Sequence, residues 1–145
     1  MLHNLASQLQ NASKSLLRQT SVPFSKNNKQ VLDILCAQGL VQSYSVGDRM
    51  GPYAPRITRN SVADARLWVD FKYRGTPVLT SVKCVSKPSR RVVMSPHELE
   101  LVAQMKGKLK STVGKVIIVK TAYGLLELHD CLRKGVGGMV LLTAN

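Results

Sequence analysis

Histidine and cysteine are the side chains of this sequence that could serve as nucleophiles, general bases or zinc ligands. Each type occurs three times, scattered along the chain: His3, His97, His129, Cys36, Cys84 and Cys131. No histidine has a Cys or Ser neighbour at a spacing typical of a catalytic pair, and no CxxC or paired-His spacing predicts a zinc site. We expect buried, reduced thiols in a reducing compartment.

Carboxylates and glycine-rich turns also fail to assemble a reactive site. Glu98 and Glu100 are two residues apart on a predicted helix, so they diverge. Gly114-Lys115 lacks the spacing of a phosphate-binding loop and the hydroxyl residue that should follow. The turn over residues 135–138 follows a predicted helix, whereas a dinucleotide fingerprint follows a strand. The sequence therefore predicts a protein that is not an enzyme, with no cofactor, no metal and no small-molecule substrate.

Positive charge is the chemistry that the sequence does carry. Among 145 residues, 21 are Lys or Arg and 8 are Asp or Glu, which gives a formal net charge of +13. No acid precedes Asp33, none lies between Leu79 and Glu98, and none lies over residues 101–126. Basic runs with so little acid predict a polyanionic partner, with nucleic acid ahead of an anionic membrane surface.

Helices and strands must position these charges. Apolar residues spaced by three and four predict helices over 2–16 and 29–38, the second ending at Gly39. Alternating patterns predict strands over 40–46, 67–73 and 78–85, of which the last two form an antiparallel hairpin. A long loop follows Gly47 and carries Arg49, Arg56 and Arg59.

The second half begins with a clear helix start at Ser95-Pro96-His97-Glu98, which combines a cap, a proline and a capping box. A central strand over 116–119, a helix over 125–134 and a last strand over 139–143 follow. We therefore expect an α+β fold of two small lobes. Residues 1–85 form an N-terminal α-β-α-β-β lobe, and residues 86–145 form a mostly β lobe with short helices. No apolar run is long enough for a transmembrane helix.

The loop from Lys120 to Gly124 is predicted to lie between a strand and a helix. It would place a hydroxyl, free backbone N–H groups and a helix N-terminus at one corner, which suits phosphate and 2′-hydroxyl contacts. The ring of Tyr123 could stack on a base or ribose, or could cover the core; both readings stay open. The turn over 135–138 would let RNA approach the backbone closely.

These segments resemble a known family, the bacterial-type eighth small-subunit ribosomal protein family. The resemblance rests on Val116-Ile-Ile-Val-Lys-Thr-Ala-Tyr-Gly124, Gly135-Val-Gly-Gly138, Val140-Leu-Leu142 and Val85-Ser-Lys-Pro-Ser-Arg-Arg91. Asn11-Ala12, Val22-Pro-Phe-Ser-Lys26 and Gly39-Leu40-Val41 match the N-terminal half of the family in order. Lys120, Ala122, Tyr123 and Met139 depart from its usual residues. With the long loop and the acid-free start, these departures indicate a fungal mitochondrial member whose targeting signal stays uncleaved in the first helix.

The resemblance implies a structural protein of the small ribosomal subunit that binds the central domain of the rRNA and supports assembly and translation. Its partners would be small-subunit ribosomal RNA and neighbouring ribosomal proteins, with no membrane. The residues expected to bind rRNA are Asn11, Ser25, Lys26, Lys29, Lys87, Ser89, Arg90, Arg91, Lys120, Thr121, Ala122, Tyr123, Gly124, Gly135, Val136, Gly137 and Gly138. Lys106, Lys108 and Lys110 would add sequence-independent attraction. Two alternatives remain: a basic RNA-modifying enzyme, and a membrane-surface protein that uses its first helix.

Overall fold

The computed structural model describes residues 2–52, 63–109 and 113–145. Arg56 and Arg59 of the predicted loop, and Lys110, lie outside these ranges. The chain forms two compact units, residues 1–81 and 82–145. The predicted division after residue 85 falls just beyond the short strand that begins the second unit. Each unit combines helices with an antiparallel sheet, which confirms the predicted α+β class.

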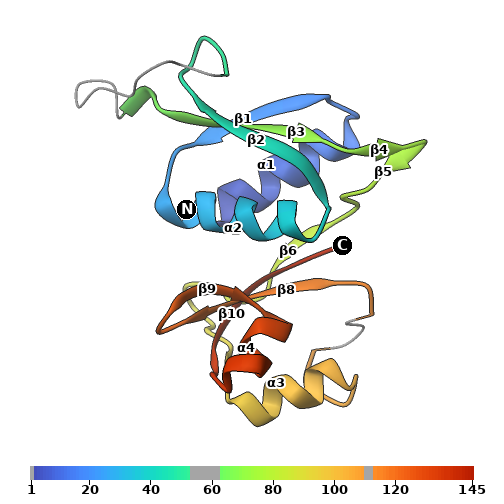
Figure 1. Ribbon diagram of the computed structural model, residues 1–145, viewed down its shortest axis with the longest axis vertical. Coiled ribbons are helices and arrows are strands. Elements are labelled where there is room, and N and C mark those ends of the chain that lie inside the picture. The colour runs from blue at the N-terminus through green and yellow to red at the C-terminus, as the bar shows by residue number, and fades with distance from the viewer. Residues whose placement is uncertain (1, 53–62, 110–112) are drawn as a thin grey trace. The chain divides into compact units, whose positions relative to one another are not determined.

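The N-terminal unit packs two helices, α1 (Leu2–Lys14) and α2 (Lys26–Ala37), on one face of a three-stranded sheet (Figure 1). The sheet has the order β1-β3-β2 and consists of β1 (Gln19–Pro23), β2 (Val41–Gly47) and β3 (Arg66–Phe71). Alternate residues of β3 are buried: Leu67, Val69 and Phe71. The short strands β4 (Tyr73–Arg74) and β5 (Thr76–Pro77) form a small hairpin with Gly75 at its turn.

Helix α2 begins three residues before its predicted start. Ser25 has the extended backbone of an N-cap, and the buried side chain of Asn28 donates a hydrogen bond to the Pro23 carbonyl over 3.0 Å. That bond closes the first turn on the preceding strand, so Lys26 to Asn28 become helical although they lack an apolar pattern. The helix ends before Gly39, as predicted.

The predicted hairpin between residues 67–73 and 78–85 is wrong. Both edges of β3 are already occupied by β1 and β2. Within 78–85 only β6 (Val82–Cys84) is a strand, and it pairs with β10 (Gly138–Ala144) of the second unit. Leu79 is instead buried in the first unit, where its carbonyl accepts a 2.5 Å hydrogen bond from the Ser13 hydroxyl.

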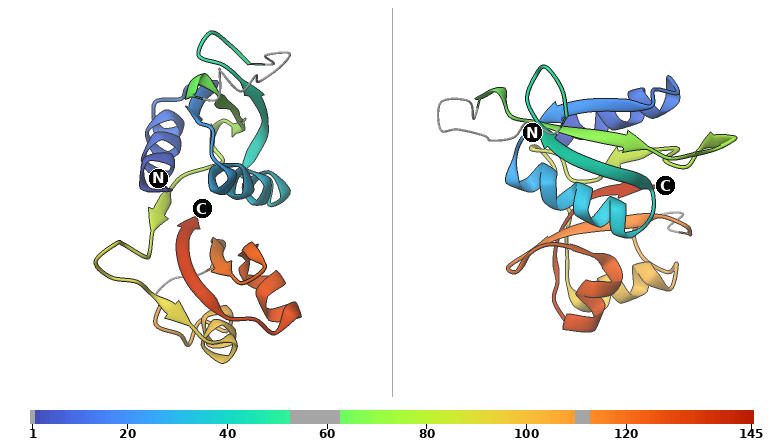
Figure 2. Two further views of the ribbon diagram at one scale, coloured as in Figure 1. Left: turned by 90° about the vertical axis from the view of Figure 1, so that its left-hand side faces the viewer. Right: turned by 45° about the horizontal axis from the view of Figure 1, so that its top comes forward.

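The C-terminal unit has a sheet of order β6-β10-β8-β9, and β7 (Val93–Met94) also pairs with β10. Its other strands are β8 (Val116–Thr121) and β9 (Gly124–Glu127), so β8 has the interior position that its apolar sequence predicts. Helices α3 (Pro96–Ala103) and α4 (Leu128–Lys134) lie on one face of this sheet (Figures 1 and 2). The core between them consists of Met94, Leu99, Val102, Ile117, Val119, Leu128, Cys131 and Val140.

The ends of the two C-terminal helices test the local predictions. At α3, the Glu98 N–H donates to Ser95 Oγ over 3.3 Å and the Ser95 N–H donates to Glu98 Oε2 over 2.9 Å, which confirms the capping box. The predicted helix over 125–134 starts too early, because residues 124–127 form β9 and pair with β8. Glu127 caps the real start by accepting the N–H of His129 over 2.9 Å.

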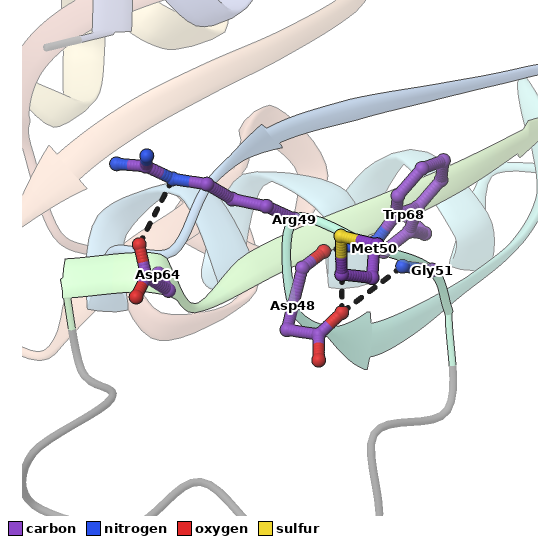
Figure 3. Close-up of polar contacts among 6 residues, drawn as sticks. All are labelled: Asp48, Arg49, Met50, Gly51, Asp64 and Trp68. Atoms are coloured by element: carbon purple, nitrogen blue, oxygen red, sulfur yellow. Dashed lines mark hydrogen bonds and ion pairs between the residues drawn. The ribbon is translucent and has the colours of Figure 1, made fainter.

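The described ends of the long loop are fastened to the N-terminal sheet (Figure 3). Asp48 Oδ1 accepts the N–H groups of Met50 and Gly51 over 2.8 and 3.0 Å. Trp68 on β3 donates its indole N–H to the Asp48 carbonyl over 2.9 Å. Arg49 forms a 2.9 Å ion pair with Asp64 across the base of the loop, so this predicted basic residue is already paired with an acid.

Candidate nucleic-acid interface

The N-terminal half of β10 brings three predicted segments of the C-terminal unit together. We call residues 87–91 the basic turn, residues 120–124 the hairpin turn and residues 135–138 the glycine turn. On one edge of β10, Met139 pairs with Lys120; on the other, Gly138 pairs with Met94. Val140 anchors both ends of the segment that carries the basic turn, through Ser86 and Val92. Segments far apart in the sequence therefore meet along one strand.

The basic turn is a tight loop with a fixed backbone and exposed side chains. Lys87 and Arg90 exchange both backbone hydrogen bonds, at 2.9 and 3.0 Å, around Pro88-Ser89. The side chains of Lys87, Ser89, Arg90 and Arg91 are exposed. Within the described ranges, no ion pair joins Lys87, Arg90 or Arg91 to an acid. Three cations are thus free to contact phosphates.

Ser86 positions this turn, and sequence reasoning missed it. Its hydroxyl donates to the Val140 carbonyl over 2.5 Å and accepts the Val92 N–H over 3.0 Å. The residue is buried, so both bonds are shielded from water. A serine before a lysine carries no local signal for this role, because the Val140 carbonyl that accepts its hydrogen bond is 54 residues away in the sequence.

The hairpin turn joins β8 to β9, so the predicted helix N-terminus at this corner is wrong. Helix α4 starts only after β9, because Leu125 and Leu126 pair with Lys120 and Val119. The Thr121 hydroxyl donates to the Gly124 carbonyl over 3.0 Å and accepts the Tyr123 N–H over 3.2 Å. Thr121 therefore shapes the turn.

Tyr123 lies at the tip of the hairpin turn, and its residue is 73% exposed. That exposure rules out the reading in which the ring covers the core. A rigidly placed, solvent-facing aromatic ring beside the exposed Lys120 has the composition of a site that stacks on bases.

The glycine turn lies where backbones approach most closely. A Cβ at Gly138 would be 2.2 Å from the Lys120 carbonyl oxygen, and one at Gly137 would be 2.6 Å from the Met94 carbonyl oxygen. Gly135 ends α4 in the left-handed region, at φ 62°. Gly137 and Gly138 are therefore required by the packing of β10 against its neighbours, whereas Gly135 is favoured by its positive φ. Gly137 and Gly138 also leave the backbone at the start of β10 without side chains.

The remaining predicted residues belong to the N-terminal unit. Asn11 is exposed on α1, Ser25 is the N-cap of α2, and Lys26 and Lys29 are exposed in the first turn of that helix. The first turn of α2 contains no acid. Two cations beside the positive end of the helix dipole are unfavourable without an anion nearby.

Acidic side chains of the C-terminal unit lie on its two helices or at the N-cap of α4. The unit has eleven Lys or Arg residues and four acids: Glu98, Glu100, Glu127 and Asp130. Glu98 is paired with Lys108 at 2.8 Å and Asp130 with Arg133 at 3.7 Å. None of the three turns contains an acid. The local field therefore favours a polyanion at the turns.

The other titratable groups offer no competing chemistry in the part of the chain that the structure covers. All three cysteines are free; Cys131 is buried as predicted, whereas Cys36 and Cys84 are only half-buried. Desolvation raises the pKa of each thiol, which favours the protonated form. Nowhere in the described ranges do three His, Cys, Asp or Glu residues gather as a metal site would require. None of the described helices is long and apolar enough to cross a membrane.

Comparison with known proteins identifies the family of the chain. The family profile described as Ribosomal protein S8 matches residues 1–144. The chain belongs to the ribosomal protein S8 family. Family membership confirms the resemblance seen in the sequence and identifies a structural ribosomal protein and not an enzyme.

Similar S8 proteins include two fungal ones named small ribosomal subunit protein uS8m. The protein of Schizosaccharomyces pombe is 38% identical, with 97% of this chain and 96% of the relative aligned. The protein of Neurospora crassa is 37% identical, with 95% and 93% aligned. Bacterial uS8 of Hyphomonas neptunium is 29% identical, with 97% and 92% aligned. These matches confirm the prediction that the chain is a mitochondrial member of the S8 family and is of the fungal type.

Proposed function

We propose that this S8 protein is a structural constituent of the mitochondrial small ribosomal subunit that binds the central domain of the small-subunit rRNA. In this role it supports subunit assembly and translation. The observation that carries the proposal is the meeting of three acid-free turns along the start of β10. One supplies cations, one supplies an exposed aromatic ring, and one supplies open backbone.

The three turns would make different kinds of contact with RNA. Lys87, Arg90 and Arg91 would neutralise phosphates, which gives affinity without regard to sequence. Thr121 to Gly124 and Gly135 to Gly138 would define the shape of one RNA site, because their backbones are fixed by hydrogen bonds and close packing.

The N-terminal unit would add a second contact. Lys26 and Lys29, in the acid-free first turn of α2, gain stability if a phosphate lies at that end of the helix. Asn11 on α1 and the Ser25 cap belong to the same proposed surface. Neighbouring small-subunit proteins are the other expected partners of this unit.

A membrane-surface role for the first helix is disfavoured by its packing. The apolar residues Leu5 and Leu9 of α1 are 1% and 0% exposed within the N-terminal unit. A surface-bound amphipathic helix must present such residues to lipid. Here they are already part of a protein core.

Crosslinking in cells, followed by sequencing of the RNA bound to the protein, tests the proposal. The expected result is enrichment of central-domain small-subunit rRNA. A variant with Thr121→Ala and Tyr123→Ala should lose that enrichment while it still crosslinks to RNA at random. Recovery of no small-subunit rRNA with the natural protein would overturn the assignment.

A further inference from the structure

A pocket of about 310 Å³ lies beside the basic turn in the C-terminal unit. Four apolar side chains line part of its wall: Val85, Val92, Met94 and Leu109. Three cations line the rest, namely Lys87, Arg90 and Lys108, and no acid contributes to the lining. The pocket thus combines an apolar surface with concentrated positive charge.

Neighbouring contacts fix the backbone of the turn that carries two of these cations and pair the third with an acid. Lys87 and Arg90 face each other across the two-residue turn that Ser86 fastens to β10. Lys108 reaches the pocket from the segment after α3, and its ammonium is 2.8 Å from Glu98 Oε1. Glu98 also belongs to the capping box of α3. The backbone on the basic-turn side of the pocket is therefore fixed before any ligand arrives, which lowers the entropic cost of binding.

The ligand that fits this combination has a flat apolar part and an anionic part. A volume of about 310 Å³ is at the lower end of the roughly 300–1,000 Å³ typical of small-ligand sites. One nucleotide fits such a volume, and a duplex does not. RNA-binding proteins take up bases that have left the stack in loops and bulges.

We infer that this pocket receives one unstacked nucleotide of the bound RNA. The base lies against Val85, Val92 and the side chains of Met94 and Leu109, and its phosphate lies among the three cations. The inference rests on the proposed function, and it adds a second base-binding site to the one proposed at Tyr123. An acidic peptide has the charge but lacks a planar ring joined directly to a phosphate.

Methyl NMR of the full-length protein tests the pocket directly. With labelled Val, Leu and Met methyl groups, adenosine or uridine monophosphate should shift the resonances of Val85, Val92, Met94 and Leu109. Inorganic phosphate should leave these methyl resonances nearly unchanged. A fragment of small-subunit rRNA should displace the mononucleotide.

Matched lysine variants identify the cation site. Lys108→Gln should weaken mononucleotide binding by about threefold to tenfold, the effect of losing one charge-assisted contact. Lys106→Gln is the control, because Lys106 is two residues away and does not line this pocket. A correctly dispersed spectrum of each variant verifies folding.

Several outcomes would overturn the inference. The first is that mononucleotides do not shift the methyl resonances of the pocket. The second is that Lys106→Gln and Lys108→Gln weaken mononucleotide binding equally. The third is that the rRNA fragment does not displace the bound mononucleotide. A Phe-Asp peptide that shifts the methyl groups when nucleotides do not would assign the pocket to a protein partner. If the rRNA fragment binds tightly but mononucleotides do not shift the pocket methyl resonances, the inference fails and the proposed function stands. If the fragment does not bind at all, the proposed function fails.

Discussion

The basic turn and the glycine turn lie against the same strand, yet they are built in opposite ways. In the basic turn, Ser86 fixes the backbone while Lys87 and Arg90 extend into solvent. In the glycine turn no side chain extends, and a Cβ at Gly138 would overlap the Lys120 carbonyl. In the proposed function, one region would attract RNA through charge, and the other would fit RNA through the position of its backbone.

This difference separates the consequences of mutation. Side chains of the basic turn contribute nothing to the core, so their loss should change binding and leave the fold intact. The glycines are part of the packing, so their loss should change the fold first. The contrast would be wrong if basic-turn variants lowered stability, or if glycine variants changed RNA binding without changing stability.

The largest effect is expected for Gly138→Ala. The added methyl would clash with the backbone of Lys120 and separate β10 from β8, at a cost of about 3 kcal/mol. Gly135→Ala is the control, since its position has open space and only its positive φ causes strain, about 1 kcal/mol. Urea unfolding measures both, and equal losses would argue against close packing as the reason for Gly138.

Ser86→Ala should come next, because it removes the fastening of the basic turn. Loss of two buried hydrogen bonds should lower the free energy of unfolding by about 2 kcal/mol. Ser89→Ala changes an exposed serine at the tip of the same turn and should leave the unfolding free energy unchanged. A stable Ser86→Ala protein would show that the turn holds its shape without this residue.

Tyr123→Ala should weaken rRNA binding without changing stability. Loss of one stacked base corresponds to about 1–3 kcal/mol of binding free energy. Tyr123→Phe keeps the ring and should bind like the natural protein. Affinity measurements with a central-domain fragment decide this point. If the Phe variant binds as poorly as the Ala variant, the hydroxyl and not the ring makes the contact.

Arg90→Ala should change how binding depends on salt. The slope of log K against log salt should fall by about 0.7–0.9 for one lost phosphate contact, for specific and random RNA alike. Lys134→Ala removes an equal charge from the exposed end of α4, outside the proposed interface, and should leave the slope nearly unchanged. Equal slopes for the two variants would place the phosphate contact elsewhere.

The smallest effect concerns pH. The hydrogen bond from Lys108 and the backbone N–H of Ser95 hold the pKa of Glu98 below its usual value. The stabilising contacts of Glu98 are therefore complete above the ordinary carboxyl pKa, and they weaken as pH falls through the lowered value. An NMR titration of the Glu98 carboxyl from about pH 6 to about pH 2 should show this shift. Lys108→Gln should return the midpoint toward the ordinary value, and an unchanged midpoint would contradict the pairing.

The parts of the fold that the sequence predicts well are those decided by local contacts. The capping box of Ser95 and Glu98 and the left-handed ends at Gly39 and Gly135 involve residues within one turn of each other. The errors concern distant partners. Leu125 and Leu126 suit helix or strand equally, and pairing with β8 makes them a strand.

The same distinction applies to the candidate interface. The acid-free turns could be recognised because charge and glycine are visible in the sequence. The contribution of Ser86 and the meeting of Lys108 with Lys87 could not, because each depends on β10 or α3 bringing separated segments together.

Strand β10 has a consequence for the timing of synthesis. It is the last strand of the unit to be made, yet it lies between β8 on one side and β6 and β7 on the other. Until residues 138–144 have left the ribosome that translates them, β6, β7 and the facing edge of β8 have no strand to pair with. The C-terminal unit is thus completed only after its other strands have been translated. A nascent chain shorter than this would lack the assembled surface that we propose binds RNA, and so could not capture RNA prematurely.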